Sequence, residues 1–435
     1  MATPQAPAPD EPVSPDDGSQ QALSESELLT AAPEVLANNL TEYFRAWGQR
    51  LRNGESGALP VIVGLVAIII FFQLERSVFL SDTNLVSVFQ EASLYVMIGA
   101  AEIFILLLSE IDLSLGYGAG VGAFVIAELI AAPVNLPWWL GIAGGLAAMA
   151  LLGLLQGVLV AYMRLPSFIV TLGGQLGFLG LMQVVANADS TAVGGVIEID
   201  PNSPVHNLYN GTMSPALTWI VMVVAVGLFA ALSLGKTRSR KSRGLAAPPL
   251  GVTLLSIAGA AIAGVVLVVV CNGNTPSGMP WVIPVVLIVL VLYTWLLART
   301  KIGRYIYAVG ANPEAARRAG INVKLVITFA FIMSSVTAGI AGLIYESSNG
   351  SMSIDIDGGQ LVLFAVATAV IGGTSLFGGR GRMFHALLGG VVIAVVFNGL
   401  ALMGVGNAVQ DICTAVVLVL ALMLDALVRG RAATR

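Results

Sequence analysis

Twelve long apolar runs constrain the fold of this chain more than any other feature. Each is close to the 17 to 25 residues that cross a bilayer as a helix. A helix also satisfies its backbone hydrogen bonds internally, as lipid requires. The runs lie at about 58–74, 85–109, 115–133, 137–163, 167–187, 215–234, 249–271, 280–298, 325–345, 359–372, 384–404 and 410–428. The pattern predicts an all-α polytopic membrane protein, a bundle of about 10–12 transmembrane helices.

The composition excludes a water-soluble enzyme. Only 11% of the residues are charged, 57% are apolar and the mean hydropathy is +0.87, whereas a soluble chain carries about 25% charged residues. The basic residues occupy short loops between apolar runs, so we expect no nucleic-acid surface. The two cysteines, Cys271 and Cys413, lie far apart in apolar surroundings, and we interpret both as small packing residues.

The chain divides into a tail and a membrane domain. Residues 1–45, rich in Ala, Pro, Ser, Asp and Glu, have too few large apolar side chains to offset the entropy of ordering, so they are predicted to form a disordered acidic cytoplasmic tail. Residues 58–428 form the predicted membrane domain. Within it, the pairs of runs at 85–133 and 359–404 are either two clean spans each or include a broken or re-entrant helix.

Glycines spaced four residues apart predict closely packed helices, because small residues let helix backbones approach each other in lipid. They recur as Gly116 and Gly120, Gly141 and Gly145, Gly153 and Gly157, and Gly173 and Gly177. With 49 glycines in the chain, no single pair indicates a specific contact. Together they indicate a tight bundle.

The distribution of basic residues predicts the topology, because Lys and Arg beside a membrane helix stay on the cytoplasmic side. Four clusters, at 45–52, 236–243, 299–324 and 429–435, hold 17 of the 21 Lys and Arg residues. The connections at 188–214, 272–279 and 346–358 contain none. Alternation from a cytoplasmic N-terminus places every cluster inside and every bare connection outside. We therefore expect an even number of crossings, with both termini in the cytoplasm.

The chain carries no motif that would let it drive transport by itself. A phosphate-binding loop needs Gly-x-x-x-x-Gly-Lys-Ser/Thr, and the nearest match, Gly235-Lys236-Thr237, has Ala230 where the first glycine belongs. Only two histidines are present, and no nucleophile has a base nearby in the sequence. We therefore expect no catalytic residue, metal site or cofactor in this chain. Energy for transport must come from ions or from another subunit.

The basic connection at 299–324 contains the signals of a short capped helix. Asn312 suits the N-cap, Pro313 the first helical position and Glu314 the positive end of the helix dipole. Two arginines suit the last turn, and Gly320 can end the helix. Two interpretations remain open: a rigid projection that docks into a partner's groove, or an ordinary capped connector.

This segment, with four other sequence blocks, resembles the permease subunits of bacterial ABC sugar importers, of the ribose, galactose and xylose branch. The blocks are Glu-Ala-Ala followed by Gly within 300–323, and the stretches Glu110–Gly116, Pro166–Gly174, Val370–Gly379 and Asn398–Gly404. They follow one another in the same order over about residues 60–428. The apolar excursion at 233–271 with its own basic loop, and the Glu-Ile-Asp-Leu-Ser spelling, are most similar to xylose-type permeases.

The resemblance implies a permease homodimer in the bacterial cytoplasmic membrane, with two cytoplasmic ATPase subunits that bind ATP and an extracytoplasmic sugar-binding protein. It implies import of a monosaccharide, and a pentose such as xylose is expected. It also implies that residues 299–324 form a coupling loop against the ATPase. Its contact residues would be Asn312, Pro313, Glu314, Ala315, Ala316, Arg317 and Gly320.

Two acidic residues near the end of a membrane run allow two interpretations. Glu110 and Asp112, with Glu102 two turns earlier, would cost about 3 kcal/mol each at the bilayer centre. Either the helix ends near Ser109, so that Glu110 lies among headgroups and Asp112 or Ser114 caps the next helix, or the carboxylates line the translocation path.

Further polar residues in the apolar runs are candidates for the wall of the path, because a passing sugar needs donors and acceptors that bind weakly. They are Gln156, Thr171, Gln175, Gln183, Thr374, Ser375, Asn398 and Asp411. Each could equally form a hydrogen bond between helices.

The alternative function is an ion-coupled secondary transporter of a small polar solute. Such a protein would carry buried acids or histidines as proton or sodium sites, and it would not need a capped projecting helix. A membrane-embedded enzyme is the weakest interpretation, because no cluster of Asp, His or Cys converges at one membrane face.

Overall fold

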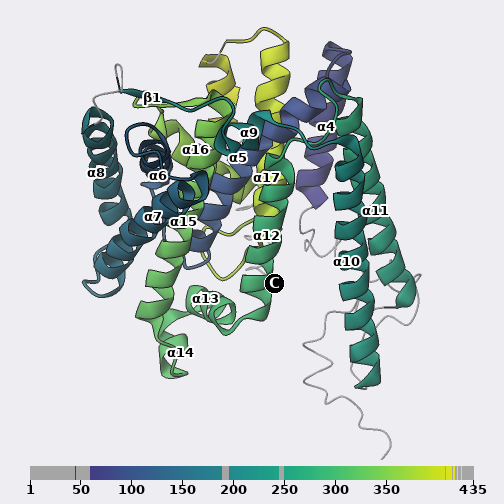
Figure 1. Ribbon diagram of the computed structural model, residues 1–435. Coiled ribbons are helices and arrows are strands. Elements are labelled where there is room, and N and C mark those ends of the chain that lie inside the picture. The colour runs from purple at the N-terminus through teal and green to yellow at the C-terminus, as the bar shows by residue number, and fades with distance from the viewer. Residues whose placement is uncertain are drawn as a thin grey trace, which may run out of the picture. The chain divides into compact units, whose positions relative to one another are not determined.

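The computed structural model describes residue 45, residues 59–188, 195–243 and 249–406, and part of 408–423. Nearly all of the predicted tail, residues 1–45, lies outside the described residues. The long helices are α4 (Leu59–Glu75), α5 (Asp82–Leu106), α6 (Leu115–Ile130), α7 (Trp138–Ala161), α8 (Ser167–Ala188), α10 (Pro215–Ser242), α11 (Leu250–Gly273), α12 (Val282–Arg299), α15 (Val323–Asn349), α16 (Gly358–Ile371) and α17 (Met383–Leu402) (Figure 1). The connections hold β1 (Val196–Glu198), α9 (Pro204–Asn210), α13 (Lys301–Ala311), α14 (Pro313–Arg318) and β2 (Ser351–Ser353).

The prediction of an all-α polytopic membrane protein is confirmed. Eleven of the twelve apolar runs coincide with the long helices, and most of the twelfth, 410–428, lies outside the described residues. Within the described part, eight helices are long and apolar enough to cross a membrane. The other three, α4, α6 and α16, are shorter.

A broken helix was one alternative for the apolar runs at 85–133 and at 359–404. Each of these two regions contains one short helix. Helix α6 has 16 residues and α16 has 14, which correspond to about 24 Å and about 21 Å. Both are shorter than the roughly 30 Å hydrocarbon core. At least one end of each helix must therefore lie within the membrane or be covered by protein there.

The chain forms two compact units. Among the described residues, the smaller unit contains 229–258, which includes the second part of α10 and the first part of α11. Within it, the hydroxyl oxygens of Thr237 and Thr253 lie 3.2 Å apart. The larger unit contains the remaining membrane helices and all residues discussed below.

Helix α15 forms the centre of the larger unit, packed against α5, α6 and α7. Glycine makes this packing possible: a Cβ added at Gly342 would collide with the Ala119 carbonyl, and one at Gly153 would lie 2.6 Å from the Phe331 carbonyl oxygen. Gly141 and Gly145 pack likewise against α6. Small residues thus bring helices together in lipid.

The three connections without Lys or Arg meet at one end of the larger unit. Strand β1 pairs antiparallel with β2, Val196 opposite Ser353, and Thr212 forms a β-bridge with Pro280. The prediction that these connections share one side is therefore confirmed. The start of the connection predicted at 346–358 is wrong. Helix α15 continues to Asn349, so Glu346 lies in this helix, where it is completely buried.

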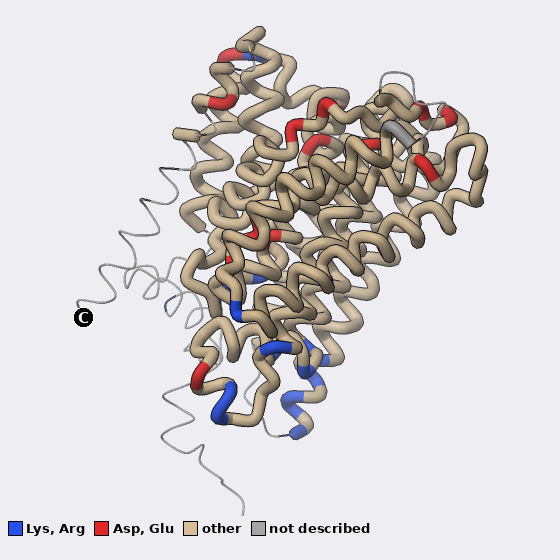
Figure 2. Tube along the Cα trace, turned by 90° about the vertical axis from the view of Figure 1, so that its left-hand side faces the viewer, with Lys and Arg blue, Asp and Glu red and all other residues tan. Residues whose placement is uncertain are grey.

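The opposite end of the larger unit holds α13 and α14, since α12 runs towards this end and α15 runs away from it (Figure 1). Figure 2 shows Lys and Arg of this unit gathered mainly at this end, and most Asp and Glu towards the other. This polarity matches the charge asymmetry that membrane proteins show between cytoplasmic and outer loops.

Candidate functional site

Helix α14 is the short capped helix that the sequence predicts. The Oδ1 atom of Asn312 accepts a hydrogen bond from the Ala315 N–H at 2.9 Å, Pro313 is the first helical residue, and Gly320 has a φ of +83° that suits glycine after a helix. Glu314 pairs with Arg317 at 2.7 Å on the exposed face. The helix therefore presents a fixed pattern of charge to solvent.

Helix α13, which precedes α14, was not predicted. Thr300 caps it, its Oγ1 accepting from the Gly303 N–H at 3.1 Å, and Ile306 and Val309 are buried. The signal was present in the sequence: Ile302, Ile306 and Val309 have the spacing of one helical face. Helix α13 therefore holds α14 against the bundle through an apolar face.

One hydrogen bond and one close packing contact join α13 to the membrane helices. The hydroxyl of Tyr307 donates to the Gly381 carbonyl at 2.8 Å, and burial raises the pKa of this hydroxyl, so it stays a donor. The Gly379 N–H donates to the Leu107 carbonyl at 2.9 Å, and Gly310 packs against both Leu107 and Gly379. Helix α13 thus contacts the end of α5 and the turn between α16 and α17.

Thr374 and Ser375 lie in that turn. The Oγ1 of Thr374 lies 3.1 Å from Nδ1 of His385, and the Ser375 hydroxyl accepts from the Phe377 N–H at 3.1 Å. Gly373, Gly378 and Gly379 have positive φ angles. The polar side chains between α16 and α17 therefore stabilise the conformation of the turn that contacts α13.

Asp112 lies in the break between α5 and α6 and is completely buried. One of its oxygens, Oδ1, accepts hydrogen bonds from the Ser114 N–H at 2.9 Å and the Ser114 hydroxyl at 2.6 Å. Gln156 of α7 donates to the same hydroxyl at 2.8 Å. The predicted helix end near Ser109 is confirmed, since α5 ends at Leu106 and a turn continues to Ser109. Ser114 makes no side-chain cap to α6, so the predicted Ser114 cap is wrong.

Other groups complete this buried set. The Thr171 hydroxyl of α8 donates to the Ile111 carbonyl at 3.3 Å. Glu102 is completely buried beside Asp112. Within the described residues, the Oδ2 of Asp112 and the Oε1 of Gln156 are buried without a hydrogen-bond partner. Glu110 lies at the partly exposed margin of the same break. The break therefore gathers polar side chains from α5, α7 and α8 inside the bundle.

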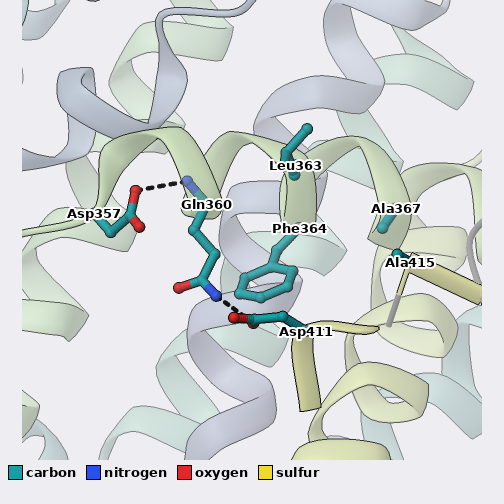
Figure 3. Close-up of a pocket in the computed structure, with 7 residues that line it drawn as sticks. All are labelled: Asp357, Gln360, Leu363, Phe364, Ala367, Asp411 and Ala415. Atoms are coloured by element: carbon teal, nitrogen blue, oxygen red, sulfur yellow. Dashed lines mark hydrogen bonds between the residues drawn. The ribbon is translucent and has the colours of Figure 1, made fainter. Parts of the chain in front are cut away.

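A cavity of about 380 Å³ lies against α16. Asp357 caps α16, its Oδ1 accepting from the Gln360 N–H at 2.9 Å, and the Gln360 amide donates to Asp411 Oδ1. Figure 3 shows the Gln360 amide, Asp411 and the Phe364 ring side by side, with Asp357 at the start of the same helix. The lining residues are Asp357, Gln360, Leu363, Phe364, Ala367, Asp411 and Ala415.

A second group of polar and aromatic side chains packs around Phe364 and its neighbours. The Tyr95 ring meets the Phe364 ring edge-on, with centroids 5.5 Å apart, and stacks on Phe397 at 6.0 Å. Asn398 donates to Glu91 Oε1 at 3.4 Å. Glu91 was not predicted, although an acid within an apolar run is the usual sign of a functional position.

The candidate path residues thus fall into separate places. Asp112, Gln156 and Thr171 come together at the break. Thr374 and Ser375 lie in the turn that contacts α13. Asp411 lines the cavity, and Asn398 bonds Glu91. Gln175 lies near the start of α16, since a Cβ at Gly359 would be 3.8 Å from its amide nitrogen. Gln183 is exposed on α8. In the described residues no cluster of three or more His, Cys, Asp or Glu could hold a metal ion.

The chain is similar to known proteins over most of its length. The family model described as branched-chain amino acid transport system / permease component matches residues 84–422. The xylose transport system permease protein XylH of Escherichia coli is 32% identical over 85% of this chain and 92% of its own length. The D-allose transport system permease protein AlsC of Escherichia coli is 29% identical over 83% and 89%. The ribose import permease protein RbsC of Escherichia coli is 28% identical over 84% and 92%. No solved structure matches the chain.

Proposed function

Because the chain belongs to the family of branched-chain amino acid transport system permease components, we propose that it is the membrane-spanning permease of an ATP-driven importer of a monosaccharide. It is a transport permease and not an enzyme. The observation that carries the proposed substrate class is the alignment over 83% to 85% of the chain with permeases named for xylose, D-allose and ribose. The preferred sugar of our proposal is a pentose such as xylose, named in the relative with 32% identity.

In this proposal two cytoplasmic ATPase subunits bind ATP and drive a homodimer of the permease in the bacterial cytoplasmic membrane. The end with α13 and α14 faces the cytoplasm, together with both termini. An extracytoplasmic sugar-binding protein delivers the sugar to the opposite end. The charge asymmetry between the two ends of the larger unit supports this orientation.

Helix α14 is the proposed contact with the ATPase. Glu314 and Arg317 are more than half exposed and fixed by their ion pair, and Asn312 caps the helix. Movement of α14 would be passed to α13 and then, through Tyr307 and Gly310, to the ends of α5 and α16. The other residues of this contact are uncharged and determine the shape of its surface. They are Asn312, Pro313, Ala315, Ala316 and Gly320.

Reversal of the charge of Glu314 tests the proposal. We expect Glu314→Lys to reduce uptake of radiolabelled xylose, ribose or allose at least about tenfold, since like charges brought together at an interface cost several kcal/mol. The fold should survive, because exposed ion pairs contribute at most about 1 kcal/mol. Glu314→Gln, which removes the ion pair with Arg317 without reversing the charge, is the control for loss of that pair.

Two results would contradict the proposal. One is uptake of branched-chain amino acids with no uptake of any sugar. The other is sugar uptake that an ionophore abolishes while ATP is maintained, which would favour the ion-coupled secondary transporter. Unchanged uptake and unchanged assembly with the ATPase in Glu314→Lys would remove α14 from the mechanism.

A further inference from the structure

We propose that the cavity lined by Asp357, Gln360, Phe364 and Asp411 is a binding station where a single monosaccharide pauses inside the permease. The inference rests on the proposed function, which supplies the substrate class but assigns no residues to it. It adds a site with a defined set of donors and acceptors.

The side chains around the cavity have the chemistry that sugars require. Asp357 and Asp411 offer carboxylate oxygens that accept from hydroxyl groups, and the Gln360 amide can both donate and accept. The Phe364 ring, 8% exposed, forms an apolar wall beside them (Figure 3). An apolar wall with a few converging polar groups is the usual composition of a small-molecule site.

The size of the cavity selects a small ligand. Its volume of about 380 Å³ is near the lower end of the roughly 300–1,000 Å³ typical of ligand pockets. A single sugar ring is therefore a better match than an oligosaccharide. Asp357 and Asp411 are themselves exposed, so a bound sugar would exchange hydrogen bonds with water and leave easily, as a transport path requires.

The position of the carboxylates supports a wet site rather than a lipid-facing surface. Acidic side chains on membrane segments face a bundle interior or a water-filled cavity, because lipid cannot solvate them. Gln360 donates to Asp411 across 51 residues of sequence, so this hydrogen bond joins the start of α16 to the segment after α17. A sugar hydroxyl that donates to Asp411 in place of the Gln360 amide would break this hydrogen bond. The start of α16 and the segment after α17 could then move apart and enlarge the cavity.

Protection from chemical labelling tests the site. In a Cys413→Ala background, Leu363→Cys places a thiol on the exposed rim of the cavity, and Asp355→Cys places a matched thiol outside it. A membrane-impermeant maleimide is applied to membranes that hold the assembled importer, with D-xylose, D-ribose or D-allose. At a sugar concentration ten times the dissociation constant, labelling at position 363 should slow about tenfold and labelling at 355 should not change.

Transport by conservative variants provides a second measurement. We expect Asp411→Asn and Phe364→Leu to raise the KM for sugar uptake at least about tenfold, the effect of about 1.4 kcal/mol of lost binding. Asp355→Asn should leave the KM unchanged. ATPase assembly serves as the measure that each variant has folded.

The outcomes separate this inference from the proposed function. Sugar import by the parent protein without protection at position 363 would overturn the binding station and leave the permease function intact. Protection by Na⁺ or Ca²⁺ but not by sugar would assign the carboxylates to a cation and also overturn it. Failure of the parent protein to import any sugar would remove the proposed function itself.

Discussion

Gly310 lies where three segments meet and a methyl group does not fit. A Cβ at this position would collide with the Leu107 carbonyl and lie 2.9 Å from the Gly379 nitrogen. We expect Gly310→Ala to lower the stability of the purified protein by about 1–3 kcal/mol, the usual cost of overpacking, and to lower its thermal unfolding temperature. Gly177→Ala is the control, because nothing lies within 4 Å of its added methyl group and alanine favours a helix. Equal unfolding temperatures for the two variants would contradict this role of Gly310.

The residues of α14 could be predicted because capping is local. Asn312 bonds three residues ahead of itself, and a pattern of that length is visible in the sequence. The surroundings of Asp112 and Glu91 could not be predicted in the same way. Gln156 reaches Ser114 across 42 residues, and Asn398 reaches Glu91 across 307. Only the folded bundle determines which of the polar side chains share a space.

At the scale of elements, the sequence predicts where helices occur better than how far they extend. Hydropathy identified the runs of α6 and α16, but the depth at which each helix ends depends on what covers it. Gly116 at the start of α6 packs against the Gly358 backbone at the start of α16, so each short helix is completed by contact with the other. Whether a short helix is a broken one or a complete span depends on what covers its ends, and hydropathy does not carry that information.

Helix α13 should transmit movement through Tyr307. Tyr307→Phe removes the hydrogen bond to Gly381, worth about 1 kcal/mol net, and leaves the ring in place. In the proposed importer we expect more ATP hydrolysed per sugar imported, with little change in unfolding temperature. Tyr305→Phe, on the same helix and 39% exposed, is the matched control. If the ratio of ATP to sugar stays the same in both variants, the Tyr307 attachment does not carry the coupling.

For the larger unit as a whole, the contacts group the connections in the way that the charge pattern predicts. The β1–β2 pair and the Thr212–Pro280 bridge join bare connections at one end, and α13 and α14 lie at the other. Contacts alone do not say which end faces the cytoplasm, because a bundle and its inverted copy in the membrane have the same contacts. The distribution of Lys and Arg carries that information.

Labelling of intact cells decides the orientation. We expect a membrane-impermeant thiol reagent to label Asp355→Cys from outside and to label Arg317→Cys only after the cells are opened. Both positions are exposed, so a difference in rate would report the side of the membrane and not burial. A Cys413→Ala background removes the one partly exposed native thiol among the described residues. Labelling of Arg317→Cys in sealed cells at the rate of Asp355→Cys would place α14 outside, where no ATPase could reach it, and the proposed coupling would be wrong.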